Sequence, residues 1–208
     1  MKKLKRNILT SLILITAVLT STVKAYGTVE VRQRLLTSAE PAVSIQKTGE
    51  NSEGEINPTT GSHGGLSASF NLRTNSDDSG YDYIISSTTP TTTPTSAFAD
   101  IGGVKAIVFV NVSNETTYQD IERAKMGNVL NRNCIAYPIS MNINNPMTVE
   151  YVPNTVQYGN CWQVRVNNGT EGTLTQTIGG TPIAGTFNVG HDSSGSYQAI
   201  VTFTAVAK

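Results

Sequence analysis

The sequence contains few of the residues on which enzyme chemistry depends. Its 208 residues include two cysteines, two histidines and one tryptophan. His63 and His191 both lie in stretches rich in glycine and serine, and no Gly-x-Ser-x-Gly segment accompanies them. The cysteines form no Cys-x-x-Cys pair. We therefore expect no catalytic residues, no cofactor and no metal ligands, and we expect both histidines to be solvated loop residues.

Acidic residues form no recognisable metal motif either. Six of them lie in two turn-rich stretches, where flexible loops could supply oxygen ligands to calcium. Their spacing does not match an EF-hand, and turns are often acidic without any metal. The sequence alone leaves calcium binding open for Glu50, Glu53, Glu55, Asp77, Asp78 and Asp82.

Charged residues are scarce, at 14% of the chain. Fifteen Lys and Arg balance fifteen Asp and Glu, and five of the basic residues precede residue 26, so residues 26–208 carry a net charge of minus five. Nucleic-acid binding depends on grouped Lys and Arg, which this part of the chain lacks. A nucleic-acid partner is therefore not expected.

The first 25 residues have the layout of a secretory signal peptide. A basic start, Met1 to Arg6, precedes an apolar run from Ile8 to Leu19, and Val23-Lys24-Ala25 is a small-x-small cleavage pattern. The apolar run is shorter than the ~20 residues that a spanning helix needs, although an uncleaved anchor is the alternative. We expect cleavage after Ala25 and export across the inner membrane to the periplasm and the cell surface.

Export implies an oxidising compartment, in which two lone cysteines usually pair. Cys134 and Cys161 are therefore predicted to form one disulfide. Closing the loop between them would contribute about 3–4 kcal/mol to stability on the chain-entropy account.

The rest of the chain has the composition and periodicity of β-structure. Thr, Ser, Gly and Asn are abundant, and apolar residues alternate with polar ones in segments joined by turn residues. This predicts an all-β protein, a single antiparallel immunoglobulin-like β-sandwich over residues 37–208. The predicted strands are residues 28–36, 42–47, 66–72, 81–86, 106–112, 134–143, 147–152, 161–166, 174–178, 183–189 and 196–206.

Several features of these segments give more specific expectations. Residues 66–72 and 81–86 are predicted to form a hairpin, and residues 147–152 to pair with residues 134–143. Residues 106–112 are apolar on both faces and are predicted to be buried on both sides. Pro138 is expected to place its strand at an edge or in a bulge. Trp162 is expected to point inward.

The remaining segments are predicted to be loops and one short helix. Residues 49–65 are expected to form a long loop, and the Thr/Pro-rich residues 86–96 a surface loop, for which O-glycosylation is the sharper alternative. The helix is expected within residues 117–130, with Thr117 as its N-cap and Gly127 at its end.

The strand at the start of the exported chain has two possible partners. Val29, Val31 and Leu35 alternate onto one face, Glu30, Arg32 and Arg34 onto the other, and Gln33 interrupts the apolar row. Pairing within its own chain would give an ordinary secreted sandwich, and pairing with a neighbouring copy would give a polymer. Residues 26–36 are therefore a candidate donor strand.

The far end of the chain carries a matching strand. Residues 196–206 alternate Tyr197, Ala199, Val201, Phe203 and Ala205 onto one face. Gly195 precedes this strand and lies fourteenth from the C-terminus, while the penultimate residue is Ala207.

With its signal peptide, alternating N-terminal strand, cysteine pair and alternating C-terminal strand, the chain resembles bacterial fimbrial subunits, the pilins assembled by a chaperone and an usher. The layout of residues 28–45, a strand followed by Ala39-Glu40-Pro41-Ala42-Val43, is similar to the α-fimbrial class. A glycine fourteenth from the C-terminus and a penultimate aromatic are common in pilins, and this chain has the first, Gly195, but not the second.

The resemblance implies a mechanism and partners. A sandwich that lacks one strand exposes an apolar groove and unpaired backbone groups, which an N-terminal strand from the next subunit fills by β-strand addition. Such a head-to-tail contact does not close and propagates as a fibre. Other copies or related subunits, a periplasmic chaperone, an outer-membrane usher and a host or surface glycan are the implied partners.

A monomeric binding module is the competing interpretation. Tyrosines on loops and strands could form a platform for a sugar ring, although they are equally good sheet residues. The candidates are Tyr26, Tyr81, Tyr83, Tyr151 and Tyr158.

Overall fold

The computed structural model describes residues 18–19, 28–34, 43–51, 54–74, 81–128, 133–144, 147–166, 171–187 and 194–207. Side chains are described within residues 54–73, 83–128, 133–144, 147–166, 171–187 and 194–206. The proposed signal peptide lies almost entirely outside the described residues, as do Leu35, Tyr26 and His191.

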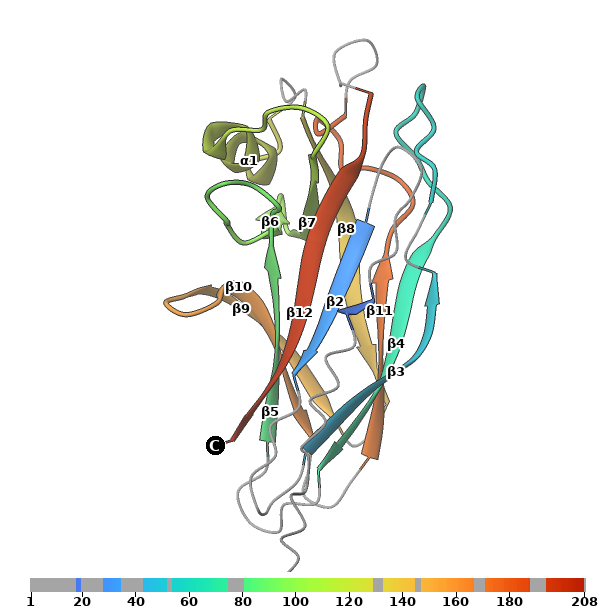
Figure 1. Cartoon of the computed structure of the whole chain (residues 1–208), viewed down its shortest axis with the longest axis vertical. Coiled ribbons are helices and arrows are strands. Elements are labelled where there is room, and N and C mark those ends of the chain that lie inside the picture. Colours follow the sequence, from blue (N-terminus) through green and yellow to red (C-terminus); the bar gives the residue numbers. More distant parts are fainter. Residues whose placement is uncertain are drawn as a thin grey trace, which may run out of the picture.

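The chain folds as the all-β sandwich that its alternation predicts (Figure 1). The strands follow the order β3-β4-β11-β8-β7-β12-β5-β10-β9, and β1, β2 and β6 pair beside this path. The elements are β1 (Val18–Leu19), β2 (Thr28–Arg34), β3 (Val43–Asn51), β4 (Leu66–Thr74), β5 (Tyr81–Thr88), β6 (Phe98–Ile101), β7 (Val104–Asn111), α1 (Tyr118–Lys125), β8 (Cys134–Ile143), β9 (Thr148–Thr155), β10 (Gly159–Val166), β11 (Glu171–Ile178) and β12 (Tyr197–Ala207).

Strand β8 joins the two layers of the sandwich. Its first half, Cys134 to Pro138, pairs with β7, and its second half, Ile139 to Ile143, pairs with β11. Pro138 lies where the strand changes partner, and its carbonyl accepts a hydrogen bond from Gly179 N at 2.7 Å. The expectation of an edge strand is therefore wrong. A proline is tolerated here because its missing N–H falls at the change of sheet rather than within a ladder.

The main core lies between the two layers. Phe70 of β4 and Phe203 of β12 meet across it with ring centroids 4.1 Å apart. Trp162 belongs to this cluster, as predicted. The alternating residues of β12 are also buried in it: Tyr197, Ala199, Val201, Phe203 and Ala205.

A second, smaller cluster lies under the helix. Ile121 and Ala124 of α1 pack with residues of β6, β7 and β8. Strand β7 is consequently buried on both faces, as its apolar sequence predicts. The N-cap Thr117 and Asp120 form a capping box.

Gly127 ends the helix by a left-handed turn with φ of 71°. Its N–H bonds to Ala124 O at 2.9 Å, and the N–H of Asn128 bonds to Arg123 O at 3.0 Å. These two bonds make a Schellman motif, which glycine favours because it has no Cβ. The helix therefore ends where the sequence predicts.

Several expected strand pairings are wrong. Strand β4 pairs with β3 and β11, whereas β5 pairs with β12 and β10, so no hairpin joins β4 to β5. Strand β9 pairs with β10 and not with β8. Alternation identifies the buried face of a strand, but it does not identify the neighbour.

Three segments also differ from expectation in their extent. Strand β3 continues to Asn51 through an irregularity between Lys47 and Gly49, into the stretch expected to be a loop. Strand β6 was not predicted. Residues 183–187 are not a strand, because Ile183 N and Thr186 Oγ1 bond to the Ala136 carbonyl and hold this segment as a turn.

His63 is packed rather than solvated. Its ring centroid lies 4.5 Å from that of Tyr137. The backbone N–H of His63 donates to Gly180 O at 2.8 Å. Burial lowers the pKa of His63. The Ile56–His63 bridge closes the loop on itself, and the contact with Tyr137, whose hydroxyl donates to Gly61 O at 2.7 Å, holds the loop against β8.

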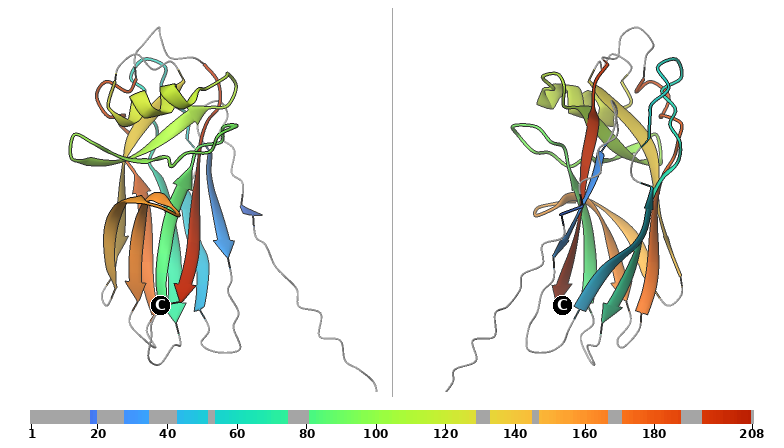
Figure 2. Two further views of the ribbon diagram at one scale, coloured as in Figure 1. Left: turned by 90° about the vertical axis from the view of Figure 1, so that its left-hand side faces the viewer. Right: turned by 45° about the vertical axis from the view of Figure 1, so that its right-hand side comes forward.

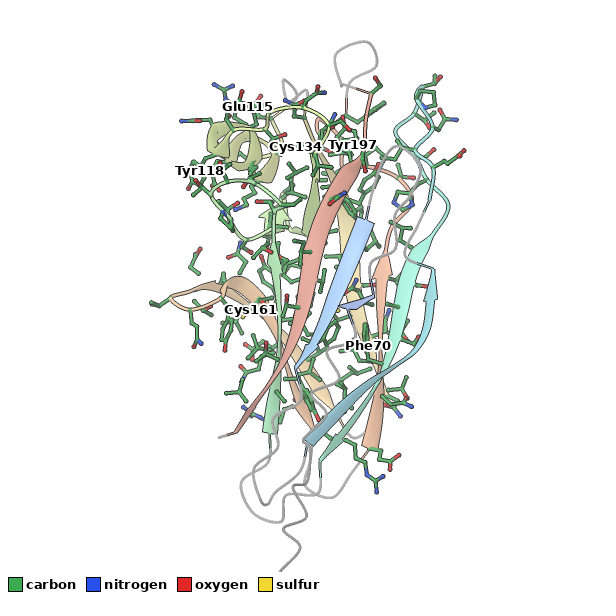
Figure 3. All side chains as sticks on the ribbon, viewed as in Figure 1. Phe70, Glu115, Tyr118, Cys134, Cys161 and Tyr197 are labelled. Atoms are coloured by element: carbon green, nitrogen blue, oxygen red, sulfur yellow. The ribbon has the colours of Figure 1, made fainter. Side chains whose placement is uncertain are left out.

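The predicted disulfide is not formed. Cys134 is buried in the cluster under α1, whereas Cys161 is buried on β10 between Ser86 and Val152. Strands β7, β12 and β5 lie between β8 and β10 in the sheet order, and Figure 3 shows the two residues at different heights of the sandwich. A disulfide requires Cα atoms within about 7 Å of each other.

We expect both thiols to be recovered intact from protein made in an oxidising compartment. Alkylation without reductant should add two labels per chain in denaturant and none, or slowly, in the native state. Both thiols are buried, and burial raises the pKa of Cys161, which keeps its reactive thiolate scarce. Intact-mass spectrometry provides the readout. Labelling in denaturant that appears only after reduction would show the disulfide and contradict this structure.

Candidate strand-addition site

The candidate strand-addition site is the edge of β12, which is the longest of the described strands. Strand β12 begins two residues after Gly195, which approaches the end of β7 closely. A Cβ at Gly195 would lie 2.6 Å from Asn111 Oδ1 and 2.7 Å from Ser113 Cβ. Ser196 N donates to Ser113 Oγ at 2.9 Å, and Val112 N donates to Ser196 O at 2.7 Å. Glycine is therefore required for the start of β12 to rest against β7.

The two edges of β12 are occupied differently. One edge pairs with β5 along residues 200–207. The other edge pairs with β7 only at Tyr197 and Gln198, since the same edge of β7 pairs with β6 along residues 104–107. Beyond that point the second edge is covered by β2, which pairs with residues 198–204 (Figure 2).

The β2–β12 pair is parallel, whereas every other pairing between described strands is antiparallel. The candidate donor strand thus lies against the C-terminal strand of its own chain. The register sets Val29 opposite Ala199, Val31 opposite Val201 and Gln33 opposite Phe203. The two valines expected to lead the donor strand therefore occupy the register positions of core-facing residues on β12.

Strand β2 pairs with the part of β12 whose alternate side chains lie in the main core. Ala199, Val201 and Phe203 are fully buried in its presence. Strand β3, at the end of the other layer, contacts both β2 and β12. Figure 1 shows β2 beside β12 on the side that faces β3. Strand β2 therefore lies along β12 and next to the end strand of the other layer.

Strand β2 is held mainly by backbone pairing to β12. Residues 35–42 link it to β3, and β1 pairs with it at Val31 and Arg32. Strand β1 falls within the predicted signal peptide, so cleavage after Ala25 would remove this second contact. A chain cleaved there would begin two residues before β2.

The paired edge of β12 offers backbone N–H and C=O groups, and an edge of this kind, when uncovered, is a template for another strand. Among the side chains that the structure describes, no three His, Cys, Asp or Glu residues gather as a metal site would require. No helix in the described part of the chain is long and apolar enough to cross a membrane.

The structure describes the side chains of three of the five tyrosines proposed as a sugar platform, and one of these, Tyr83, is buried away from any surface. Tyr83 is fully buried and donates its hydroxyl to Arg73 O at 2.7 Å. Tyr151 and Tyr158 are half-buried near the β9–β10 hairpin. The side chains of Tyr26 and Tyr81 lie outside the described residues. The sequence could not separate these roles, because a tyrosine suits either the core or a surface.

Comparisons with family models, with curated proteins and with solved structures found no match to this chain.

Proposed function

We propose that this chain is a secreted structural subunit of a surface fibre, a pilin-like protein that assembles by β-strand addition. The observation that supports this function is the parallel seating of β2 on an otherwise open edge of β12. Strand β2, early in the chain, thus supplies a strand to the sheet edge formed by β12, late in the chain. The same slot can accept the equivalent strand of another copy.

The slot allows a closed and an open arrangement. When β2 fills the slot of its own chain, the subunit is complete and monomeric. When β2 fills the slot of a neighbour, each subunit donates one strand and accepts one, and the contact propagates head to tail. The backbone bonds are equivalent in the two arrangements, so exchange costs little once β2 is released. A periplasmic chaperone and an outer-membrane usher would supply the release and the ordering of subunits.

We expect cells that express the protein to show a ladder of oligomers on a denaturing gel, which heating collapses to monomer. Val31→Asn should weaken the ladder strongly, because position 31 lies opposite buried Val201. Arg32→Asn is the matched control, since it lies opposite half-buried Thr202 and should leave the ladder intact. A protein that remains monomeric at all concentrations in surface and periplasmic fractions would refute the fibre proposal.

A further inference from the structure

A cleft of about 550 Å³ lies on the far side of the sandwich from β2. We call it the hairpin cleft. Its walls come from the end of α1, the β6–β7 hairpin and the β9–β10 hairpin, which projects at the left of Figure 1. A second hollow of about 420 Å³, lined by Trp162 and Met141, lies on the other side of the Lys105 side chain. The residues that matter in the hairpin cleft are Asp100, Lys105, Glu122, Lys125, Tyr151 and Asn160.

The charges in the hairpin cleft are already matched. Lys105 Nζ bonds to the carboxylate of Asp100, and Lys125 Nζ bonds to Glu122 Oε1 at 2.9 Å. Two cations thus face two carboxylates. An ionic ligand would have to break one of these pairs, whereas a neutral ligand would not. The cleft therefore favours an uncharged, polar molecule.

Two buried hydrogen-bond donors near Lys105 have no partner, one on a residue that lines the hairpin cleft and one on a residue that lines the second hollow. Tyr151 Oη and Trp162 Nε1 are both inaccessible to solvent and unpaired in the described structure. Their rings pack edge to face, with centroids 5.2 Å apart. Leaving a buried donor unpaired is unfavourable, so a native structure usually provides an acceptor for it. Hydroxyl oxygens of a bound molecule would satisfy both.

The Tyr151 hydroxyl is a permanent donor at neutral pH. Burial raises the pKa of Tyr151 to about 12, and the nearby charges of Asp100 and Cys161 act in the same direction. Deprotonation would not compete with donation to a ligand.

Lys105 covers these groups with a movable side chain. Its ammonium lies 4.4 Å from the centroid of the Tyr151 ring. A cation–π contact of this kind is weak when the lysine is partly solvated. Lys105 also forms the shared wall of the two hollows. Displacement of its side chain would join them and uncover the face of the tyrosine ring.

The opposite wall is rigid. Asn160 Nδ2 donates to Phe98 O at 2.8 Å, and Asn160 Oδ1 accepts from Asn154 N at 3.0 Å. These bonds fix the β9–β10 hairpin to β6. Asn154 has φ of 54°, the one described non-glycine residue with a positive φ, a turn conformation that asparagine adopts readily. The wall is therefore preorganised for a ligand.

We propose that the hairpin cleft binds a neutral saccharide once the Lys105 side chain is displaced. The sugar ring lies against Tyr151, and its hydroxyl oxygens accept from Tyr151 Oη in the cleft and from Trp162 Nε1 in the joined second hollow. Matched charges, two donors without acceptors and an aromatic face together fit a polyhydroxylated, uncharged ring better than an anion or a cation. Strands β12, β5 and β10 separate β2 from β9 in the sheet, so the cleft does not depend on strand addition and stays accessible if the fibre forms.

Trp162 is the only tryptophan, so its fluorescence reports directly on the cleft. We expect a saturable change in emission when the full chain is titrated with methyl glycosides of glucose, galactose, mannose and N-acetylglucosamine, for at least one of the four. Sialyllactose serves as the anionic comparison and should bind more weakly than the preferred neutral sugar. Saturation-transfer NMR on the same samples checks the titration independently.

Tyr151→Phe should raise the dissociation constant about tenfold. The thermal midpoint should stay the same or rise, because the hydroxyl has no partner in the unliganded protein. Tyr158→Phe, on the same hairpin but outside the cleft, should leave the dissociation constant unchanged. Lys105→Ala removes the side chain that lies over Tyr151 and should therefore lower the dissociation constant.

Three results would overturn the proposal: no saturable change with any neutral glycoside, an unchanged dissociation constant in Tyr151→Phe, or tighter binding of sialyllactose. A lower affinity in Lys105→Ala would overturn the role of Lys105 as a cover. The titration needs no oligomer, so a negative titration would not contradict the fibre proposal. Likewise, the absence of an oligomer ladder would not contradict saccharide binding in the hairpin cleft.

Discussion

Protein lacking residues 26–36 is expected to lose about 4 kcal/mol of stability and to recover it when the missing strand is added as a peptide. Removal of β2 leaves the edge of β12 unpaired along residues 198–204 and uncovers Ala199, Val201 and Phe203. Burial of a large apolar side chain contributes roughly 1.5–3 kcal/mol, and these side chains would be exposed in part. A peptide with the same sequence can pair with the backbone of β12 and place its valines against the apolar side chains. The peptide should therefore restore the lost stability.

The measurement is thermal unfolding of the shortened protein with and without a peptide of residues 26–36. We expect the midpoint to fall by about 8–16 °C and to rise again with peptide concentration, as a ligand that binds only the folded state requires. A peptide with Val29 and Val31 both replaced by Asn is the matched control and should rescue poorly. A shortened protein with an unchanged midpoint and no response to peptide would show that β2 does not complete the fold.

Phe203→Ala is expected to be the most damaging single substitution in β12, with a loss of about 3–5 kcal/mol. Phe203 is fully buried, and its ring lies 4.1 Å from that of Phe70 in the opposite layer. The truncation would leave a cavity where the two layers meet beneath β2. The thermal midpoint should fall by about 6–20 °C. Val156→Ala, at a fully exposed position on the β9–β10 turn, should change the midpoint by no more than a degree or two.

A double-mutant cycle tests whether the two phenylalanines act together. Because each ring contacts the other, the loss in Phe70→Ala with Phe203→Ala should be smaller than the sum of the single losses by about 0.5–1.5 kcal/mol. Urea unfolding of the four proteins gives these free energies. Additive losses would show that the rings stabilise the core independently.

The faces of the strands could be predicted from the sequence. In β12, β4 and β10 the residues that alternate as apolar are the ones that face the core, and β7, apolar on both faces, is covered by the other layer and by α1. The helix was also foreseeable, because Thr117 and Gly127 act on bonds within one turn. These features depend on the local period of the chain and on short hydrogen bonds.

The partners of the strands could not be predicted. The same alternation suits a strand in a hairpin or in the opposite layer, so β4 and β5 were expected together although they lie in different layers. Pro138 was expected at an edge or in a bulge, because the change of partner along β8 has no local sequence signal. The disulfide was predicted because the chain has two cysteines and was expected to enter an oxidising compartment. The two residues are apart because three strands lie between β8 and β10 in the sheet order.

For the candidate site, the alternation of residues 28–36 and 196–206 predicted two strands, and the structure has strands over Thr28–Arg34 and Tyr197–Ala207. Their parallel pairing could not be predicted, because it joins segments that are far apart in the chain. The hairpin cleft is likewise a tertiary feature, since Lys105, Tyr151 and Trp162 come from β7, β9 and β10 and converge only when those strands pack. Local periodicity determines which face of the strand a side chain occupies, and long-range packing determines which residues it contacts.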